Sequence, residues 1–208
     1  MILLTSILAV AATYLMGSVS FAVVVSRVLG IQDPRTFGSG NPGATNVLRS
    51  GSKKAAILTL LLDLLKGYIP VVLAIWLTSK LDWPFYVVPL VGLAAFLGHL
   101  YPVFFGFKGG KGVATAAGVL LAFSPLMALA VLVLWLLVAV VTRYSSLAAL
   151  IAAALAPVFY VLFHWNSGIN IATVAAIAIM AVFLIYRHRQ NIQKLMAGTE
   201  SKIGQKKS

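Results

Sequence analysis

Long apolar runs separated by short polar segments set the pattern of this chain. Most of the runs approach the roughly 20 residues that a helix needs to cross a bilayer. Seven runs can be distinguished, at Ile2–Val28, Ala55–Thr78, Phe85–Phe105, Val113–Phe123, Leu126–Val141, Leu147–Phe163 and Ile171–Tyr186. The pattern therefore predicts an all-α integral membrane protein with seven transmembrane helices, in which residues 1–208 form a single domain.

The fourth run, Val113–Phe123, is short, because at 1.5 Å per residue it covers only about 16 Å. It is either a half-span or the first part of the run that follows it. Ser124 and Pro125 favour a new helix at this point, since serine suits the cap position and proline suits the first helical turn.

Charge decides between these alternatives. With seven crossings and an external N-terminus, most basic residues lie on the inner side: Arg35, Arg49, Lys53, Lys54, Lys108, Lys111, Arg143, Arg187, Arg189, Lys194, Lys202, Lys206 and Lys207. If residues 113–141 formed one span, Arg143 and the basic tail 187–208 would lie outside, against the positive-inside rule. We therefore predict an external N-terminus, a cytoplasmic tail and glycine-rich cytoplasmic loops. The apolar N-terminus, which lacks a basic start and a clear cleavage site, is expected to be a retained span.

Composition narrows the function. The chain is 61% hydrophobic and has no cysteine, which excludes disulfides, thiol catalysis and cysteine-ligated metals. Its net charge of +12, with only four acids, favours anionic lipids or an anionic substrate. Nucleic acid is not expected as a partner, because the charge is not gathered in a soluble domain. No His, Asp or Glu cluster has metal-ligand spacing, and no metal or cofactor is expected.

The first candidate site is the glycine-rich loop Gly38–Arg49, between the first two runs. Glycines let backbone N–H groups surround an anion, and Arg49 can hold a phosphate through two parallel hydrogen bonds. The glycines and neutral donors of the loop are Gly38, Gly40, Gly43, Ser39, Asn41, Thr45 and Asn46. We interpret the loop as a phosphate-binding cradle at the membrane surface. The alternative is a solvated connector that merely follows the charge rule.

A second glycine-rich turn, Phe107–Thr115, runs directly into the fourth apolar run. It contains Lys108, Gly109, Gly110, Lys111 and Gly112. A helix start offers free N–H groups and the positive end of the helix dipole, so this segment suits an anion. It lacks the spacing of the nucleotide P-loop. The alternative is that its two lysines only anchor the inner interface.

Further polar candidates lie at other inner positions. His188 and Asn191 are three residues apart and share a helix face, although the basic residues around them also fit topology alone. Ser146 can reach an anion or simply cap a helix. Asp63 and Lys66, within the second run, are first interpreted as a structural ion pair and second as a proton-coupled transport site. His99 is expected to order the Lys108–Lys111 loop.

Five segments together carry a resemblance to a known family. They are Gly38–Arg49, Asp63–Gly67, Gly109–Thr115, Arg187–Ile192 and Gly198–Glu200. They resemble the bacterial acyl-phosphate-dependent glycerol-3-phosphate acyltransferases, and the likeness extends from Gly17 to Gly204. The resemblance implies a seven-helix enzyme of the bacterial inner membrane with its site at the cytoplasmic face. It would transfer a fatty acyl group from acyl-phosphate to the 1-hydroxyl of sn-glycerol 3-phosphate, giving lysophosphatidic acid and phosphate.

The resemblance also implies a place in metabolism and a set of site residues. The reaction would be the first step of phospholipid synthesis, with a functional link to the enzyme that forms the acyl-phosphate. Matching the family motifs assigns the substrate phosphates and the reacting carbonyl to Ser39, Arg49, Lys108, Ser146, His188 and Asn191, with support from Asn41, Thr45 and Lys111. The general base is left open between His188 and an oxygen of a substrate phosphate.

Two other classes of function compete with this interpretation. A small organophosphate transporter would need polar residues through the bilayer, whereas only Asp63 and Lys66 lie at depth. A basic lipid-binding scaffold is the third possibility, and any catalytic turnover would exclude it.

Overall fold

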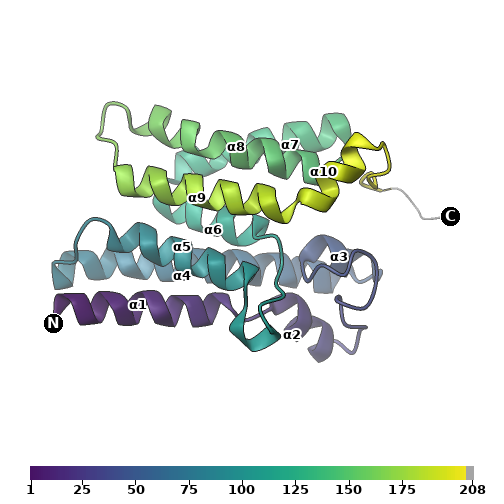
Figure 1. Ribbon diagram of the computed structural model, residues 1–208, viewed down its shortest axis with the longest axis horizontal. Helices are drawn as coiled ribbons and strands as arrows, with labels where there is room; N and C mark the ends of the chain where they lie inside the picture. The colour runs from purple at the N-terminus through teal and green to yellow at the C-terminus, as the bar shows by residue number, and fades with distance from the viewer. Residues whose placement is uncertain (205–208) are drawn as a thin grey trace. The chain divides into compact units, whose positions relative to one another are not determined.

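The computed structural model describes residues 1–204, and every regular element within them is helical (Figure 1). The elements are α1 (Ile2–Gly17), α2 (Phe21–Val28), α3 (Ala44–Leu48), α4 (Lys53–Leu81), α5 (Val87–Leu100), the 3-10 turn η1 (Val103–Phe105), α6 (Val113–Phe123), α7 (Pro125–Thr142), α8 (Ser145–His164), α9 (Ile171–Arg187) and α10 (Arg189–Met196). Lys206 and Lys207 of the predicted basic tail lie outside the described residues.

The chain divides into two compact units, unit 1 at Met1–Phe123 and unit 2 from Ser124 onward. Four segments are long and apolar enough to cross a membrane unaided: Lys53–Leu81, Val87–Phe105, Pro125–Thr142 and Ser145–His164. Two bent pairs, α1 with α2 at 45° and α9 with α10 at 57°, raise the number of candidate spans to six. The shorter α6 would be the seventh, so the structure supports a multi-pass helical protein.

The first predicted span, residues 2–28, needs correction, because the helix breaks after Gly17. The Val23 N–H bonds to Ser20 rather than continuing the regular ladder to Val19. The Val19 carbonyl instead accepts a hydrogen bond from Lys66 Nζ at 2.7 Å. A buried cation therefore takes the place of a helical N–H at the break.

The ends of two other predicted elements also differ. The third run was predicted to continue to Phe105, but α5 ends at Leu100, where Tyr101 precedes a proline and so disfavours helical backbone. The tail was predicted only as basic, yet it contains α10. The start of a new helix at Pro125, expected from the Ser124-Pro125 pair, is confirmed.

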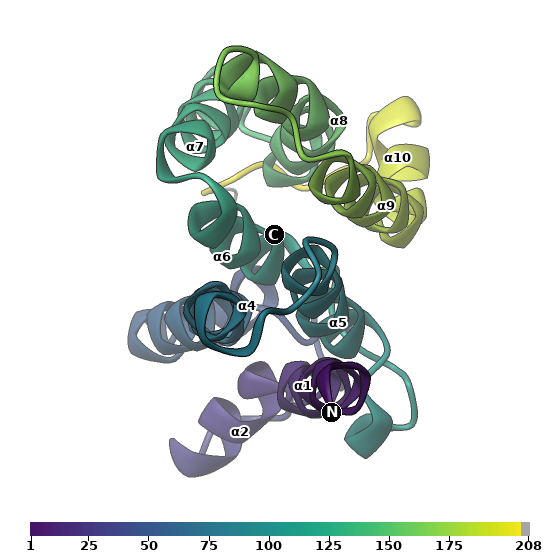
Figure 2. The ribbon, with the colours of Figure 1, turned by 90° about the vertical axis from the view of Figure 1, so that its left-hand side faces the viewer.

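Unit 1 is a bundle in which α5 packs against α1 and α4, and α6 packs against α4 (Figure 2). Glycines let these backbones approach closely, as is common between membrane helices. A Cβ on Gly17 would meet the Ala95 carbonyl of α5, and one on Gly118 would meet the Leu64 carbonyl of α4. Phe96 and Val119 are fully buried in this packing.

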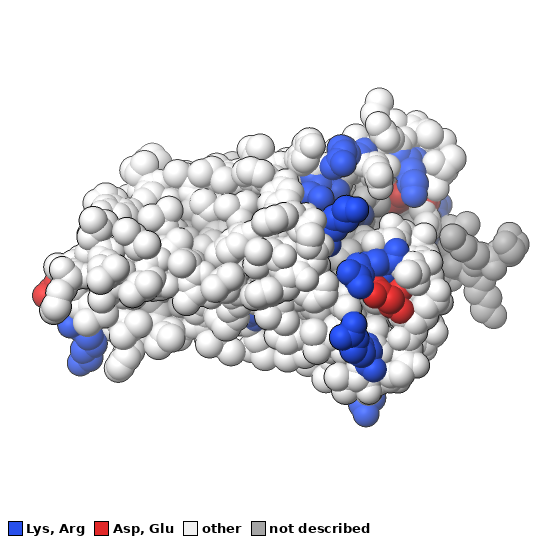
Figure 3. Space-filling model, turned by 60° about the horizontal axis from the view of Figure 1, so that its bottom comes forward, with Lys and Arg blue, Asp and Glu red and all other residues white. Residues whose placement is uncertain are grey.

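In unit 2, α8 packs against both α7 and α9. Its contact faces are made of small residues, with Ala148, Ala149, Ala152 and Ala156 all buried. Large apolar side chains, such as Val140 and Val141 of α7, point outward and are mostly exposed. On the face shown in Figure 3, the long sides of the helices carry almost no charge, and Lys and Arg gather near helix ends. Such broad apolar faces are suited to lipid contact.

Candidate active site

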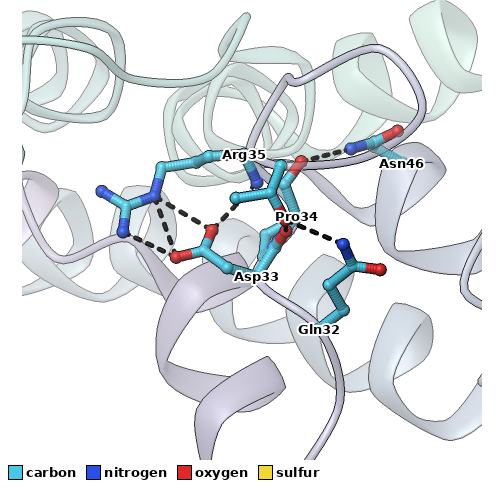
Figure 4. Close-up of polar contacts among 6 residues, drawn as sticks. Gln32, Asp33, Pro34, Arg35 and Asn46 are labelled. Atoms are coloured by element: carbon cyan, nitrogen blue, oxygen red, sulfur yellow. Dashed lines mark hydrogen bonds and ion pairs between the residues drawn. The ribbon is translucent and has the colours of Figure 1, made fainter.

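The glycine-rich loop of unit 1 is organised by the side chain of Asn46, which is almost fully buried. Its Nδ2 donates to the carbonyls of Pro34 at 2.6 Å and Phe37 at 3.2 Å. Its Oδ1 accepts from the Ser39 N–H at 2.9 Å. Asn46 was expected to be an anion donor, but its amide is used to fold the loop, as Figure 4 shows for the bond to Pro34.

An ion pair secures the start of this loop. The Arg35 guanidinium bonds to both carboxylate oxygens of Asp33, with the shortest contact at 2.6 Å (Figure 4). The hydrogen bond from Arg35 is the main reason that the pKa of Asp33 lies below its ordinary value. Arg35 also lies over the Phe105 ring, 5.6 Å from its centroid. The pair joins the loop to the segment after α5.

Residues 35–40 line an open depression of about 380 Å³, so that Arg35 of the ion pair forms part of its wall. Gly38 and Gly40 have positive φ angles, at +60° and +66°, which glycine adopts without strain. A Cβ on Gly38 would lie 3.3 Å from Arg49 Cδ, so the Arg49 side chain passes beside the depression. The structure thus brings Gly38, Ser39 and Arg49 together in unit 1, as predicted.

The outer part of the loop holds the remaining predicted donors. The Gly43 N–H bonds to the Asn41 carbonyl at 3.0 Å, and Thr45 lies in the short helix α3. The Gly40 N–H likewise donates to the Phe37 carbonyl at 2.9 Å. Some of the backbone N–H groups that were expected to bind an anion are therefore bonded to carbonyls of the loop itself.

The second glycine-rich turn follows η1 and is bound to the end of α5. Gly109 N–H donates to the Leu100 carbonyl at 3.2 Å, and Gly110 N–H donates to the His99 carbonyl at 3.1 Å. Both glycines are buried, and a Cβ on Gly109 would collide with α5 backbone. These glycines serve close packing rather than anion binding.

The two lysines of this turn differ in their exposure to solvent. Lys108 is exposed and Lys111 is half-buried beside Gly112, whose φ is +87°. A Cβ on Gly112 would meet the Phe96 ring, so glycine is required there. The buried glycines of this turn thus serve its packing, and Lys108 is its exposed cation.

The predicted ion pair inside α4 is confirmed. Lys66 Nζ lies 2.8 Å from Asp63 Oδ1, and both side chains are almost fully buried. The imidazole Nδ1 of His99 lies 3.5 Å from the same oxygen. His99 also contacts the glycine turn, because its Nε2 occupies the space that a Cβ on Gly110 would need.

In unit 2, one carboxylate binds two of the predicted site residues. Glu200 Oε1 accepts a hydrogen bond from Ser146 Oγ at 2.6 Å and another from Asn191 Nδ2 at 2.7 Å. Glu200 thereby ties the start of α8 to α10. It belongs to one of the segments behind the family resemblance, yet it was given no role. The sequence feature that could have pointed to a role for Glu200 is that it is the only acid in the basic tail 187–208.

His188 occupies the bend between α9 and α10 and is almost fully buried. Its Nδ1 lies 2.8 Å from the Leu184 carbonyl. A carbonyl can only accept, so Nδ1 carries the hydrogen and Nε2 of the neutral ring holds the lone pair. His188 is the residue that caps the start of α10, and Asn191 lies three residues on, within that helix.

The segment after α10 returns to the start of α8. Ile203 N–H donates to the Arg143 carbonyl at 2.7 Å, and Arg143 Nη2 donates to the Ile203 carbonyl at 2.9 Å. Lys202 lies over the Tyr144 ring, 5.6 Å from its centroid. Among residues 1–204, no group of three His, Asp or Glu side chains is arranged to hold a metal ion.

A family model described as glycerol-3-phosphate acyltransferase matches residues 7–198. The chain belongs to the glycerol-3-phosphate acyltransferase family. A protein of that name from Ralstonia pickettii (strain 12J) is 61% identical over 199 residues, covering 94% of this chain and 93% of the relative. A second, from Burkholderia cenocepacia, is 60% identical over 201 residues, covering 97% of this chain and 92% of the relative.

Solved structures agree with the family assignment. The glycerol 3-phosphate form of PlsY, an integral membrane glycerol 3-phosphate acyltransferase, is 42% identical, with a TM-score of 0.86 over 96% of each chain. Its lysophosphatidic acid form is 41% identical, with a TM-score of 0.85. The resemblance seen in the sequence motifs is therefore confirmed. This glycerol-3-phosphate acyltransferase is an enzyme of the membrane, and the transporter alternative has no support.

Proposed function

We propose that this acyltransferase uses acyl-phosphate as its donor and the 1-hydroxyl of sn-glycerol 3-phosphate as its acceptor. The products are lysophosphatidic acid and inorganic phosphate, in the first step of phospholipid synthesis. The observation that carries the proposal is the pair of solved relatives, one a glycerol 3-phosphate form and the other a lysophosphatidic acid form. These two molecules are the acceptor and the product of such a transfer.

The charge of the chain supports this donor. Both proposed substrates and the leaving group are phosphates, and a chain with 16 Lys and Arg against four acids is suited to stabilise them. The acceptor oxygen forms an ester bond to the acyl carbon while the bond from that carbon to the phosphate oxygen breaks. Phosphate leaves with the bonding electrons, and the hydroxyl proton passes to a base.

In unit 1, Ser39, Arg49 and Lys108 bind substrate phosphate, and Asn41, Thr45 and Lys111 support them. Among the described residues, neither Arg49 nor Lys108 takes part in an ion pair with an acid. No acid within residues 1–204 is close enough to pair with either charge. An Arg or Lys in this state is well suited to a phosphate, which can accept from it directly.

In unit 2, the family motifs assign Ser146, His188 and Asn191 to the reaction. Because Nδ1 bonds to the Leu184 carbonyl, the acceptor atom of a neutral His188 ring is Nε2. Two routes for the hydroxyl proton remain: His188 Nε2 as general base, or an oxygen of a substrate phosphate. Acyl-phosphate already carries a good leaving group, which favours the second route.

We further propose seven spans within one domain, an external N-terminus, and a site on the cytoplasmic face of the bacterial inner membrane. The separate helices α6 and α7 supply the crossing that this orientation needs. The acyl chain can lie among the apolar helix faces without leaving lipid.

The orientation can be tested by labelling, because the chain has no cysteine of its own. Single cysteines at Ser79 and Ser167 should react in intact cells with a membrane-impermeant maleimide. Cysteines at Ser50 and Ser201 should react only after the membrane is opened. The reverse pattern would overturn the orientation while leaving the enzyme class untouched.

The donor is tested with purified protein, palmitoyl-phosphate and glycerol 3-phosphate. Phosphate and lysophosphatidic acid should appear together in equal amounts, and phosphate release should require the acceptor. Palmitoyl-CoA replaces palmitoyl-phosphate in a parallel reaction. Product from the CoA donor but none from palmitoyl-phosphate would refute the proposed donor.

A further inference from the structure

Unit 1 buries three ionisable side chains that have no role in the proposed chemistry: Asp63, Lys66 and His99. Their exposed fractions are 2%, 4% and 7%. Asp63 Oδ1 lies 2.8 Å from Lys66 Nζ and 3.5 Å from His99 Nδ1. Ionisable groups are costly within membrane helices and commonly serve a function there. The question is therefore what this cluster, joining α4 to α5, accomplishes.

On one side, the cluster bonds to the backbone at the break between α1 and α2. Lys66 Nζ donates to the Val19 carbonyl at 2.7 Å, which the break has removed from the helical ladder. The same ammonium lies 5.6 Å from the centroid of the Phe21 ring. Lys66 therefore has Asp63, a backbone carbonyl and an aromatic ring as partners. These partners come from the break after α1, from α2 and from α4.

The other side of the cluster contacts the glycine turn. The His99 carbonyl accepts from the Gly110 N–H at 3.1 Å. The His99 imidazole fills the space where any side chain on Gly110 would begin, with Nε2 as the nearest atom. Backbone and ring of one histidine thus both contact Gly110. Any movement of His99 must move the turn that carries Lys108 and Lys111.

We propose that Asp63, Lys66 and His99 form a positioning cluster that holds the Gly109–Gly110 turn, so that Lys108 and Lys111 meet a substrate phosphate. The inference rests on the proposed function, in which those lysines bind phosphate. Lys66 pairs with Asp63 at 2.8 Å, the Asp63 carboxylate faces the His99 ring at 3.5 Å, and the ring packs against Gly110. None of the three acts on the substrate directly.

The test is a double-mutant cycle with His99→Gln and Lys111→Gln, in which the Michaelis constants for glycerol 3-phosphate and palmitoyl-phosphate are measured separately. Lys111→Gln identifies the substrate whose phosphate this turn binds. His99→Gln should raise the same Michaelis constant by about 5-fold to 10-fold, and change kcat and the other constant by less than about 2-fold. The double variant should show much less than the product of the two effects, because both changes act on one contact.

His164→Gln is the matched control, since His164 is a histidine of unit 2 whose ring bonds to the Tyr160 carbonyl of its own helix, α8. It should leave both Michaelis constants unchanged. If His99→Gln cannot be purified, Gly110→Ala replaces it under the same criterion, because its Cβ would displace the His99 ring.

A purely structural cluster would give a different result. The melting temperature and kcat would fall, both Michaelis constants would stay unchanged, and the effects would multiply with those of Lys111→Gln. That outcome overturns the positioning role. An inactive wild-type protein with palmitoyl-phosphate would instead refute the proposed donor, so the two failures are distinguishable.

Discussion

The two units build their polar regions in opposite ways. In unit 1, a neutral amide, Asn46, holds the loop through three hydrogen bonds, and the cation Arg49 has no acidic partner among the described residues. In unit 2, an acid, Glu200, holds two neutral donors, Ser146 and Asn191. The charge of Glu200 is thus used for internal structure in unit 2, whereas the described part of unit 1 offers Arg49 no acid as a partner.

This contrast separates residues that act on substrate from residues that act on the protein. A cation without an acidic partner keeps its full attraction for a phosphate. A carboxylate that accepts from two part-buried donors leaves both without that acceptor if it is removed. Substitution of Arg49 should therefore change substrate binding, and substitution of Glu200 should first change stability.

The largest effect is expected for Arg49→Ala. Loss of a bidentate phosphate contact should lower kcat/KM for glycerol 3-phosphate by about 100-fold or more. Arg49→Lys should recover only part of this loss, because lysine lacks the planar fork. Steady-state kinetics on the purified variants measure both. Lys54→Ala, a change of an exposed cation nearby, is the control, and an equal loss there would indicate a general charge effect.

Glu200→Ala comes next. It leaves Ser146 Oγ and Asn191 Nδ2 without their shared acceptor, which should destabilise unit 2 by about 1–3 kcal/mol. Glu200→Gln should be much milder, since its amide oxygen can still accept from both. Thermal unfolding in detergent measures the difference. Equal melting temperatures for the two variants would contradict the role of Glu200 as an acceptor.

His188→Gln tests whether unit 2 supplies the base that takes the hydroxyl proton. If a substrate phosphate takes the proton, turnover should fall only a few-fold, since the loss is limited to positioning. A fall of about 100-fold or more, at unchanged melting temperature, would make His188 the base. Unit 2 would then carry the proton transfer as well as internal structure. The measurement is kcat at saturating concentrations of both substrates.

The smallest effect is expected for Asp33→Asn. Because Arg35 lowers the pKa of Asp33 in the folded chain, the pair adds stability above the unfolded value, and this is lost as pH falls through the folded value. Both side chains are partly exposed, so the difference at neutral pH should be about 0.5 kcal/mol or less. Melting temperatures of wild type and variant should converge in acid. Asp82→Asn is the matched control.

Much of the fold followed from residue patterns. The apolar runs predicted the long helices, and Ser124-Pro125 predicted the start of α7 because both residues act locally. The break after Gly17 did not follow, since it depends on Lys66 reaching Val19 from another helix. Polar contacts between distant segments leave no periodic pattern in the sequence.

The candidate site shows the same limit. The loop Gly38–Arg49 was predicted, and the structure does bring Gly38, Ser39 and Arg49 together. The internal use of Asn46 was not foreseen, because an amide in a polar loop has the same sequence signature whether it binds an anion or backbone. Glu200 was likewise left without a role, since its partners lie 54 and nine residues away.

The most direct test of the contrast between the units is equilibrium binding of glycerol 3-phosphate, measured by calorimetry without any donor. We expect Arg49→Ala to lose measurable binding, and Glu200→Gln to bind with a Kd within about 3-fold of wild type. Unchanged binding by Arg49→Ala would contradict the claim that the cations of unit 1 are held for a substrate phosphate.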